Sequence, residues 1–270
     1  MPLRIVQSMQ NSRLKLLRRA FNRRDRDAAA LAAIEGPNLL EEALRAHLTI
    51  ESIFVAQGAE HLLEPLHLPD EIEVLMLPKE LLDAALSTET PQSIAALVKP
   101  PLWSWDQVFP ARSTVAPLIL VLAGLQDPGN LGAIVRSAEA FAARAILCLP
   151  GTVSAWNPKA VRASAGSLFR LPLLSVSAEE CFSRLRKEGV NILSTAVHGA
   201  SSADRADLAA PVALVIGNEG SGVPEELAAL ADAAVTIPCP GPVESLNAAV
   251  AAGVLLYEAS RQRSLKRSAR

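Results

Sequence analysis

The sequence predicts an α/β protein that has a mostly parallel sheet in its C-terminal part and a smaller α/β domain before it. Continuous apolar runs such as PLILVLAGL at residues 117–125 are typical of strands buried on both faces. Segments with helical spacing alternate with these runs, as expected of βαβ units. Of the 270 residues, 50% are hydrophobic and 20% are charged, which suits a packed core and opposes disorder.

Charge and cysteine content narrow the class of protein. The net charge is −2, so no global positive field indicates a nucleic-acid partner. Cys148, Cys181 and Cys239 form no CxxC pair, which is typical of reduced thiols in a cytoplasmic protein. The histidines lack zinc-site spacing, so we expect no metal. The polar N-terminus and the short apolar runs predict neither a signal peptide nor a membrane span.

Residues 1–100 form the first predicted domain, and residues 8–26 within it have the spacing of a basic amphipathic helix. Its cationic residues are Arg13, Lys15, Arg18, Arg19, Arg23, Arg24 and Arg26. Two interpretations stay open. The charges form a solvated helix face, which charge alone slightly favours, or they meet RNA phosphates.

The rest of this domain alternates between predicted strands and helices. The expected strands are 28–34, 50–57, 71–77 and 93–98, and the expected helices are 37–47 and 78–86. Residues 101–116 follow as a linker, because Pro100 and Pro101 suit neither a helix interior nor a central strand. Trp103 and Trp105 in that linker either stack on a base or pack against a neighbouring domain, and we favour packing.

Residues 117–270 form the second predicted domain. Its expected strands are 117–125, 143–150, 190–197, 211–216 and 233–238. Its expected helices are 130–141, 177–189, 223–232 and a long one from near Ser245 into a basic tail. That tail contains Arg261, Arg263, Lys266, Arg267 and Arg270. Residues 156–172 form a connection.

Loops at the ends of three predicted strands carry the polar residues that matter most. Ligands bind beyond the carboxyl ends of the strands in open parallel sheets, so we expect these loops to share one edge. In the loop at 125–132, Asn130 is placed to cap the next helix. Arg136 lies on that otherwise apolar helix and needs a partner, which is either a salt bridge or a substrate phosphate.

The other two loops differ in chemistry. The loop at 215–222 reads GxxGxG from Gly217 to Gly222 rather than GxGxxG, which opposes a nicotinamide site. Glu219 within it caps the turn or orients a reacting group. In the third loop, Ser245 is placed to cap the final helix, and free amides at a helix start suit an adenosyl or phosphate ligand. An ordinary strand-to-helix turn is the alternative.

Three motifs together resemble the SpoU-TrmH family of RNA ribose methyltransferases, within the SPOUT superfamily. They read LQDPGNLGAIVRSAEAF, VIGNEGSGVPEEL and IPCPGPVESLNAAVAAGVLLYEASRQR, and the resemblance covers residues 117–263. NPKAVRASAGSLFRLP is similar to the family's central connection. EGPNLLEEAL and STETPQSIAALV resemble its substrate-binding domain, a small fold like that of certain ribosomal proteins. Cys239 departs from the methionine that the family often has after Ile-Pro.

The resemblance implies a deep trefoil knot, a homodimer with each site near the subunit interface, and methyl transfer from S-adenosylmethionine to a ribose 2′-hydroxyl of RNA. It implies that Arg136 acts on the acceptor ribose and leaves the general base open. The residues that it places around Arg136 and the substrate are Asn130, Glu219, Ser245 and Asn247. Those that it places at the cofactor are Thr195, Gly217, Ile237 and Leu246.

The target RNA and the activity itself have alternatives. By resemblance to the family alone, the appended N-terminal domain implies large-subunit rRNA of the 23S type, and a tRNA is the alternative within the same chemistry. A non-catalytic RNA-binding protein of the same fold is opposed by the intact set of site residues. A nucleotide-binding oxidoreductase is opposed by the missing dinucleotide fingerprint.

Overall fold

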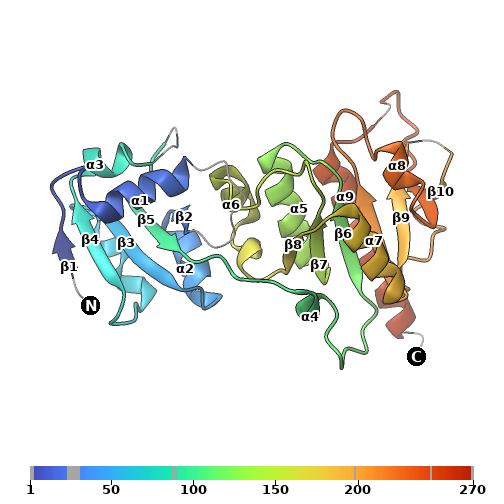
Figure 1. Cartoon of the computed structure of the whole chain (residues 1–270), viewed down its shortest axis with the longest axis horizontal. Coiled ribbons are helices and arrows are strands. Elements are labelled where there is room, and N and C mark those ends of the chain that lie inside the picture. Colours follow the sequence, from blue (N-terminus) through green and yellow to red (C-terminus); the bar gives the residue numbers. More distant parts are fainter. Residues whose placement is uncertain are drawn as a thin grey trace. The chain divides into compact units, whose positions relative to one another are not determined.

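The computed structural model describes residues 3–22, 31–86, 88, 90–197, 199–243 and 245–268. It divides into two compact units, shown together in Figure 1. The first consists of Met1–Leu102 with Ser154–Arg170, and the second of Trp103–Val153 with Leu171–Arg270. The structure therefore groups residues 154–170 with the first unit, whereas the sequence-based division placed them in the 117–270 domain.

The first unit contains a mixed five-stranded sheet with the order β1-β4-β3-β5-β2. Its strands are β1 (Leu3–Ile5), β2 (Ala32–Glu35), β3 (Ile50–Ala56), β4 (Glu73–Leu77) and β5 (Ile94–Val98). Strands β1, β4 and β3 are parallel, and β5 runs antiparallel to both β3 and β2. The strands expected at 50–57, 71–77 and 93–98 are confirmed. Of the strand expected at 28–34, residues 28–30 lie outside the described residues.

Short helices complete this unit. They are α1 (Ser12–Phe21), α2 (Pro37–Arg45), α3 (Lys79–Asp83), and the 3-10 turns η1 (Glu60–Leu62) and η2 (Glu64–Leu66). Strand β1 was not predicted, because three exposed residues leave no periodic pattern to read.

Helix α1 confirms the predicted amphipathic pattern, since Leu14, Leu17 and Phe21 are buried. Its basic residues differ in their contacts and exposure. Arg13 forms ion pairs with Glu51 at 3.6 Å and Glu73 at 3.5 Å. The exposed cations are Lys15, Arg18 and Arg19, whereas Arg23, Arg24 and Arg26 lie outside the described residues.

Residues 154–170 join the first unit through charged contacts. They form α6 (Pro158–Ser164) and the 3-10 turn η3 (Ser167–Phe169). The carboxylate of Glu35 is buried and accepts a 2.9 Å hydrogen bond from Arg162. Arg170 donates to Glu42 at 2.5 Å. A buried carboxylate needs such partners, so these contacts fix the segment to the first unit.

The second unit is built on a seven-stranded sheet with the order β10-β12-β9-β11-β6-β7-β8. Its strands are β6 (Leu118–Leu122), β7 (Ala145–Cys148), β8 (Leu173–Ser175), β9 (Asn191–Thr195), β10 (Ser201–Ser202), β11 (Val212–Ile216) and β12 (Ala233–Thr236). All these neighbours pair in parallel, which confirms the predicted sheet. The two shortest edge strands, β8 and β10, were not predicted.

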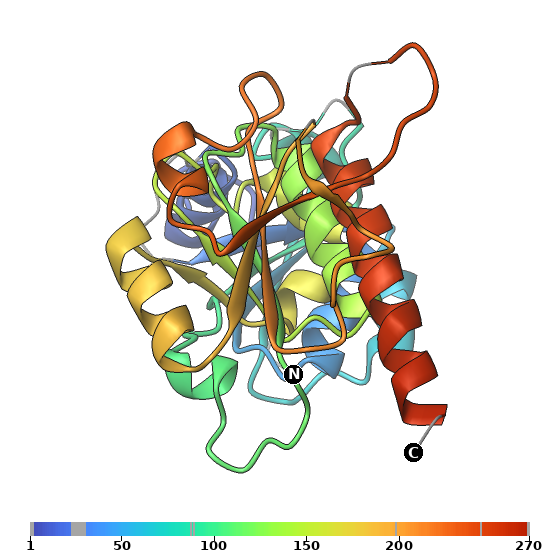
Figure 2. The same ribbon diagram turned by 90° about the vertical axis from the view of Figure 1, so that its right-hand side faces the viewer.

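Helices cover both faces of this sheet. They are α4 (Trp105–Val108), α5 (Pro128–Ala140), α7 (Ala178–Lys187), α8 (Glu225–Ala228) and α9 (Ala248–Ser268). Helices α5 and α9 pack together on one face, and α7 lies on the other (Figure 2). Every residue of β6 and β11 is buried, as their apolar sequences require. The trefoil knot stays a prediction.

The predicted linker is packed against the second unit. The side chains of Trp103, Trp105 and Phe109 pack against its core. Trp105 stacks on Phe109 with ring centroids 6.1 Å apart, and its Nε1 donates to Glu180 at 2.8 Å. The packing interpretation for these tryptophans is confirmed.

Within the described residues, no helix is long and apolar enough to cross a membrane. The same residues contain no group of three or more His, Cys, Asp or Glu side chains placed to hold a metal ion.

Candidate active site

The three predicted loops meet through a chain of hydrogen bonds. Asn130, in the first turn of α5 after β6, donates from Nδ2 to Oε1 of Glu219 at 2.8 Å. Asn247, directly before α9, donates from Nδ2 to Oδ1 of Asn130 at 3.0 Å. Glu219 belongs to the loop that follows β11. Because all three loops follow carboxyl ends of parallel strands, distant segments converge at one edge of the sheet.

The cap of helix α5 is Asp127 rather than Asn130, which corrects the sequence prediction. A carboxylate oxygen of Asp127 accepts hydrogen bonds from the amides of Gly129 at 2.5 Å and Asn130 at 3.1 Å. Pro128 occupies the first turn, where the missing N–H costs nothing. Asp127 thus satisfies the helix start and leaves both polar atoms of the Asn130 side chain for Glu219 and Asn247.

The cap of helix α9 is Asn247 rather than Ser245, a second correction. Oδ1 of Asn247 accepts from the amides of Ala249 at 2.9 Å and Val250 at 3.3 Å. Asparagine caps as well as serine does, and Asn247 is the residue adjacent to the first turn. Since its oxygen serves the helix, its Nδ2 is the atom directed to Asn130. Ser245 is exposed, two residues before the cap.

Glu219 is held as an anion. Burial raises the pKa of its carboxyl, but hydrogen bonds from Asn130 and from the backbone amides of Glu219, Gln126 and Asp127 outweigh this effect, so the pKa lies below its ordinary value. Glu219 orients Asn130 and ties its own loop to the loop after β6. The turn is capped instead by Asn218, whose Oδ1 accepts from the amide of Gly220 at 2.8 Å.

Gly217 is required by the shape of its loop. The amide of Asn218 donates to the carbonyl of Gly222 at 3.0 Å, and the reverse bond is 2.9 Å long. A Cβ on Gly217 would lie 2.0 Å from the carbonyl carbon of Gly222. Asn218 also donates from Nδ2 to the carbonyl of Gly124 at 2.9 Å, which fixes the loop beside the end of β6.

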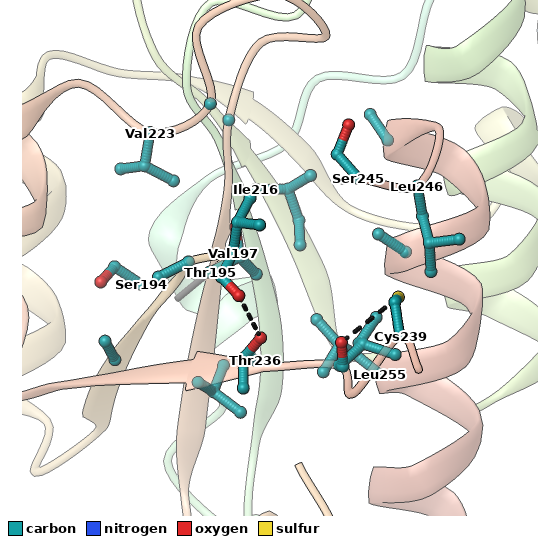
Figure 3. Close-up of a pocket in the computed structure, with 18 of the residues that line it drawn as sticks. Ser194, Thr195, Val197, Ile216, Val223, Thr236, Cys239, Ser245, Leu246 and Leu255 are labelled. Carbon is teal, nitrogen blue, oxygen red and sulfur yellow. Dashed lines mark hydrogen bonds between the residues drawn. The ribbon is translucent and has the colours of Figure 1, made fainter. Parts of the chain in front are cut away.

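A cavity of about 1130 Å³ lies beside these loops, slightly above the usual range for small-molecule sites. Its lining includes the four predicted cofactor residues Thr195, Gly217, Ile237 and Leu246. Two predicted catalytic residues, Glu219 and Ser245, also line it. In Figure 3, Thr195 and Ile216 lie at strand ends on one side, and Ser245 and Leu246 lie across from them beside α9.

Several lining residues had no signal in the sequence. Thr236 donates from Oγ1 to the carbonyl of Val197 at 3.2 Å, and Leu255 approaches from α9 (Figure 3). They belong to the cavity because β9, β12 and α9 end or pass beside it, which only the fold reveals. Cys239 is also in the lining and donates a weak 3.4 Å hydrogen bond from Sγ to the carbonyl of Ile237.

Arg136 stands apart from this group. It is exposed on α5, and among the described residues it has no hydrogen bond or ion pair. The salt-bridge interpretation is therefore not realised within the described part of the chain. The lining of the cavity does not include Arg136, so its guanidinium is free for a ligand that comes from outside.

Comparisons with known proteins agree in both parts of the chain. The family model "SpoU rRNA Methylase family" matches residues 117–257, and "MRM3-like substrate binding domain" matches residues 11–96. The 23S rRNA (guanosine(2553)-2′-O)-methyltransferase RlmP of Bacillus subtilis (strain 168) is 32% identical over 252 residues, which cover 93% of this chain and 97% of that protein.

Solved structures separate into two groups by coverage. The SpoU methyltransferase AviRb from Streptomyces viridochromogenes, in complex with the cofactor AdoMet, is 28% identical with a TM-score of 0.82, over 94% of this chain and 99% of that one. The A. aeolicus TrmH/SpoU tRNA modifying enzyme is 27% identical with a TM-score of 0.51, over 60% of this chain and 81% of that one.

Proposed function

The chain belongs to the SpoU rRNA methylase family, whose members methylate RNA riboses with S-adenosylmethionine, and we propose that its own substrate is 23S-type ribosomal RNA. The protein is an S-adenosylmethionine-dependent RNA 2′-O-methyltransferase. The observation that carries the substrate proposal is the extent of the match. Similarity to a 23S rRNA enzyme extends over 93% of the chain and so includes the N-terminal unit.

A tRNA substrate has weaker support. The similar tRNA-modifying structure covers only 60% of this chain, whereas a separate substrate-binding family model matches residues 11–96. A non-catalytic RNA-binding role has no support, because Asn130, Glu219 and Asn247 form a connected group beside the cavity.

The cavity suits the cofactor. Thr195, Gly217, Ile237 and Leu246 contribute a mixture of backbone groups and apolar side chains, as an adenosyl group requires. Cys239, which stands where the family often has methionine, lines the same cavity. S-adenosylmethionine supplies a sulfonium-bound methyl group when it is bound. The chain must then hold the acceptor hydroxyl in line with that methyl group, and good orientation alone contributes roughly 7–11 kcal/mol.

We assign the orienting roles to the hydrogen-bonded chain. Ionised Glu219 fixes Asn130, Asn130 and Asn247 fix each other, and Ser245 presents an exposed hydroxyl at the cavity wall. Arg136 binds the RNA phosphate or the developing alkoxide as a permanent cation. We assign Arg136 this electrostatic role and no proton transfer, and the general base stays open.

We also propose a homodimer that buries the outer side of α9. Val250, Val254 and Tyr257 recur there at helical spacing and are 52%, 39% and 57% exposed. Large apolar side chains grouped on one helix face are typical of a contact surface. A site near this surface would let a second copy contribute to RNA binding beside Arg136. We further propose a cytoplasmic location, which the proposed ribosomal substrate supports.

Transfer of labelled methyl groups in vitro tests the substrate proposal. An unmodified 23S rRNA transcript and an unmodified tRNA pool are offered separately to the purified protein with labelled S-adenosylmethionine. Label should enter the 23S transcript and be absent from the tRNA pool. The phosphodiester bond that follows the labelled ribose should resist alkaline hydrolysis, because its 2′-hydroxyl is methylated. Label in the tRNA pool alone would overturn the rRNA assignment.

A further inference from the structure

Arg263, near the end of α9, is held by carbonyl groups only. It donates to the carbonyl oxygens of Leu208, Ala116, Pro117 and Ala210 at 3.0, 2.6, 3.1 and 2.7 Å. These bonds occupy most of its five N–H donors and fix the position of its charge. Among the described residues, no carboxylate forms an ion pair with Arg263.

Arg144, just before β7, shares this environment. It donates to Oγ of Ser113 at 2.7 Å and to the carbonyl of Val115. Because Val115, Ala116 and Pro117 are consecutive, the guanidinium groups of Arg144 and Arg263 lie on neighbouring carbonyls. Two positive charges are therefore held close together, and within the described chain neither forms an ion pair.

The pKa values of both guanidinium groups are lowered, and they share burial as the first cause. Burial lowers the pKa of Arg144. Burial also lowers the pKa of Arg263, and the neighbouring charges of Arg144 and Arg267 lower it further, while Asp207 opposes them. A single acidic neighbour does not balance three arginines, so this place carries excess positive charge.

Three exposed cationic residues lie close along the chain to Arg263 or to Ser113, which Arg144 contacts. Lys266 and Arg267 lie three and four residues after Arg263, on the same side of α9. Arg112 directly precedes Ser113 in the loop before β6. With the described residues these three side chains form no hydrogen bond or ion pair. We call the group the amino-edge cluster: Arg112, Arg144, Arg263, Lys266 and Arg267.

The cluster lies at the end of the sheet opposite the cavity. Pro117, Ala210 and Arg144 precede β6, β11 and β7, whereas the cavity lies beyond the carboxyl ends of the strands. A five-residue strand such as β6 spans about 17 Å. A ligand that meets both places must therefore extend along the unit. The helix dipole of α9 stabilises cations in its last turn. Arg112 and Arg144 are not on a helix, so this effect does not explain the whole cluster.

We propose that the amino-edge cluster binds the phosphodiester backbone of the RNA substrate, outside the methyl-transfer site. Arg263, whose donors are mostly occupied by carbonyl oxygens, contributes fixed positive charge to this edge. The exposed side chains of Lys266 and Arg267 supply the contacts that neutralise the phosphates. This inference rests on the proposed RNA methyl transfer and adds a second RNA-binding place to it.

The test reverses one exposed charge that forms no hydrogen bond or ion pair with the described residues. Lys266→Glu is compared with Lys187→Glu, which makes the same charge change at an exposed lysine, likewise unpaired within the described chain, in the last turn of α7 on the other face of the sheet (Figure 2). Binding of an unmodified 23S rRNA transcript is measured from low to high salt, with S-adenosylmethionine affinity as the check on folding.

The α9 variant should bind RNA more weakly, and its log–log salt slope should be less steep by about 0.7 to 0.9, which is the contribution of one phosphate contact. The α7 variant should match the wild type. An α9 variant with unchanged slope, or with a loss equal to that of the α7 variant, would overturn the proposal while leaving the proposed function intact. A wild-type protein that neither binds nor methylates the transcript would overturn both.

Discussion

Asn130 donates from its side-chain amide to the carboxylate of Glu219 over 2.8 Å, although 89 positions separate the two residues in the chain. This bond joins the loop after β6 to the loop after β11, and the bond from Asn247 to Asn130 adds the start of α9. The acceptor ribose is therefore expected to meet a preformed polar group rather than three independent loops.

Replacing Glu219 with Gln should slow methyl transfer on the order of 10²-fold, because a small displacement of the groups that orient the substrate is costly. S-adenosylmethionine affinity should change little. Rapid single-turnover transfer and a cofactor titration on one preparation separate the two effects. Full single-turnover activity in the variant would contradict the orienting role of Glu219.

The lowered pKa of Glu219 also predicts a pH signature. Its contribution to stability is present above the unfolded pKa, about 4.3, and is lost as the pH falls through the lower folded value. The difference in melting temperature between wild type and Glu219→Gln should be constant from pH 7 to about 5 and should close below about pH 4. A difference that stays constant down to pH 3 would show that the carboxylate is not the stabilising form.

Two changes at Asn247 separate its structural role from its role in the site. Asn247→Asp keeps an oxygen for the cap of α9 but removes the amide that donates to Asn130, so transfer should fall while stability stays near that of the wild type. Asn247→Ala should also lose about 0.5–2 kcal/mol of unfolding free energy. Chemical denaturation and transfer assays on both variants decide. Equal stability of the two would refute the assignment of Asn247 as the cap.

Gly217→Ala should disturb the cofactor loop, because the added Cβ would lie 2.0 Å from the carbonyl carbon of Gly222. We expect weaker S-adenosylmethionine binding and a lower melting temperature. Gly241→Ala is the matched control in the same cavity lining, since nothing lies within 4 Å of a Cβ built there. Calorimetric titration should show weaker S-adenosylmethionine binding for Gly217→Ala and unchanged binding for Gly241→Ala.

Arg136→Ala should abolish transfer and leave both folding and cofactor binding near wild type, because the side chain is exposed and has no partner among the described residues. Arg136→Lys keeps the charge but loses the planar fork, so it should restore only part of the activity. Melting curves, cofactor titration and transfer rates are compared across the pair. A marked loss of stability in either variant would indicate a structural role instead.

The sequence was sufficient for most of the alternation of strands and helices and for the three loops, because the first two loops follow continuous apolar runs that form the buried strands β6 and β11. The capping residues were misassigned. Asp127 and Asn130 both suit a helix start, as do Ser245 and Asn247, and local chemistry does not choose between them. The side chain of Asn130 is instead bound by Glu219 and Asn247, both from distant loops.

Residues 154–170 show a second limit of local reasoning. Their place in the first unit rests on the buried Glu35 and on Arg162, which are 127 positions apart. No periodic pattern connects such residues. The shortest strands, β1, β8 and β10, also lack enough residues for a pattern and acquire their conformation from a neighbouring strand.

The most direct test of the central claim, ribose methylation of 23S-type rRNA at this site, is a transcriptome-wide map of 2′-O-methyl groups in cells with and without the protein. We predict that one ribose of the large-subunit rRNA loses its methyl group in the absence of the protein. The wild-type chain should restore that methyl group, and the Arg136→Ala variant should not. An unchanged rRNA map, or a loss confined to tRNA, would contradict the account.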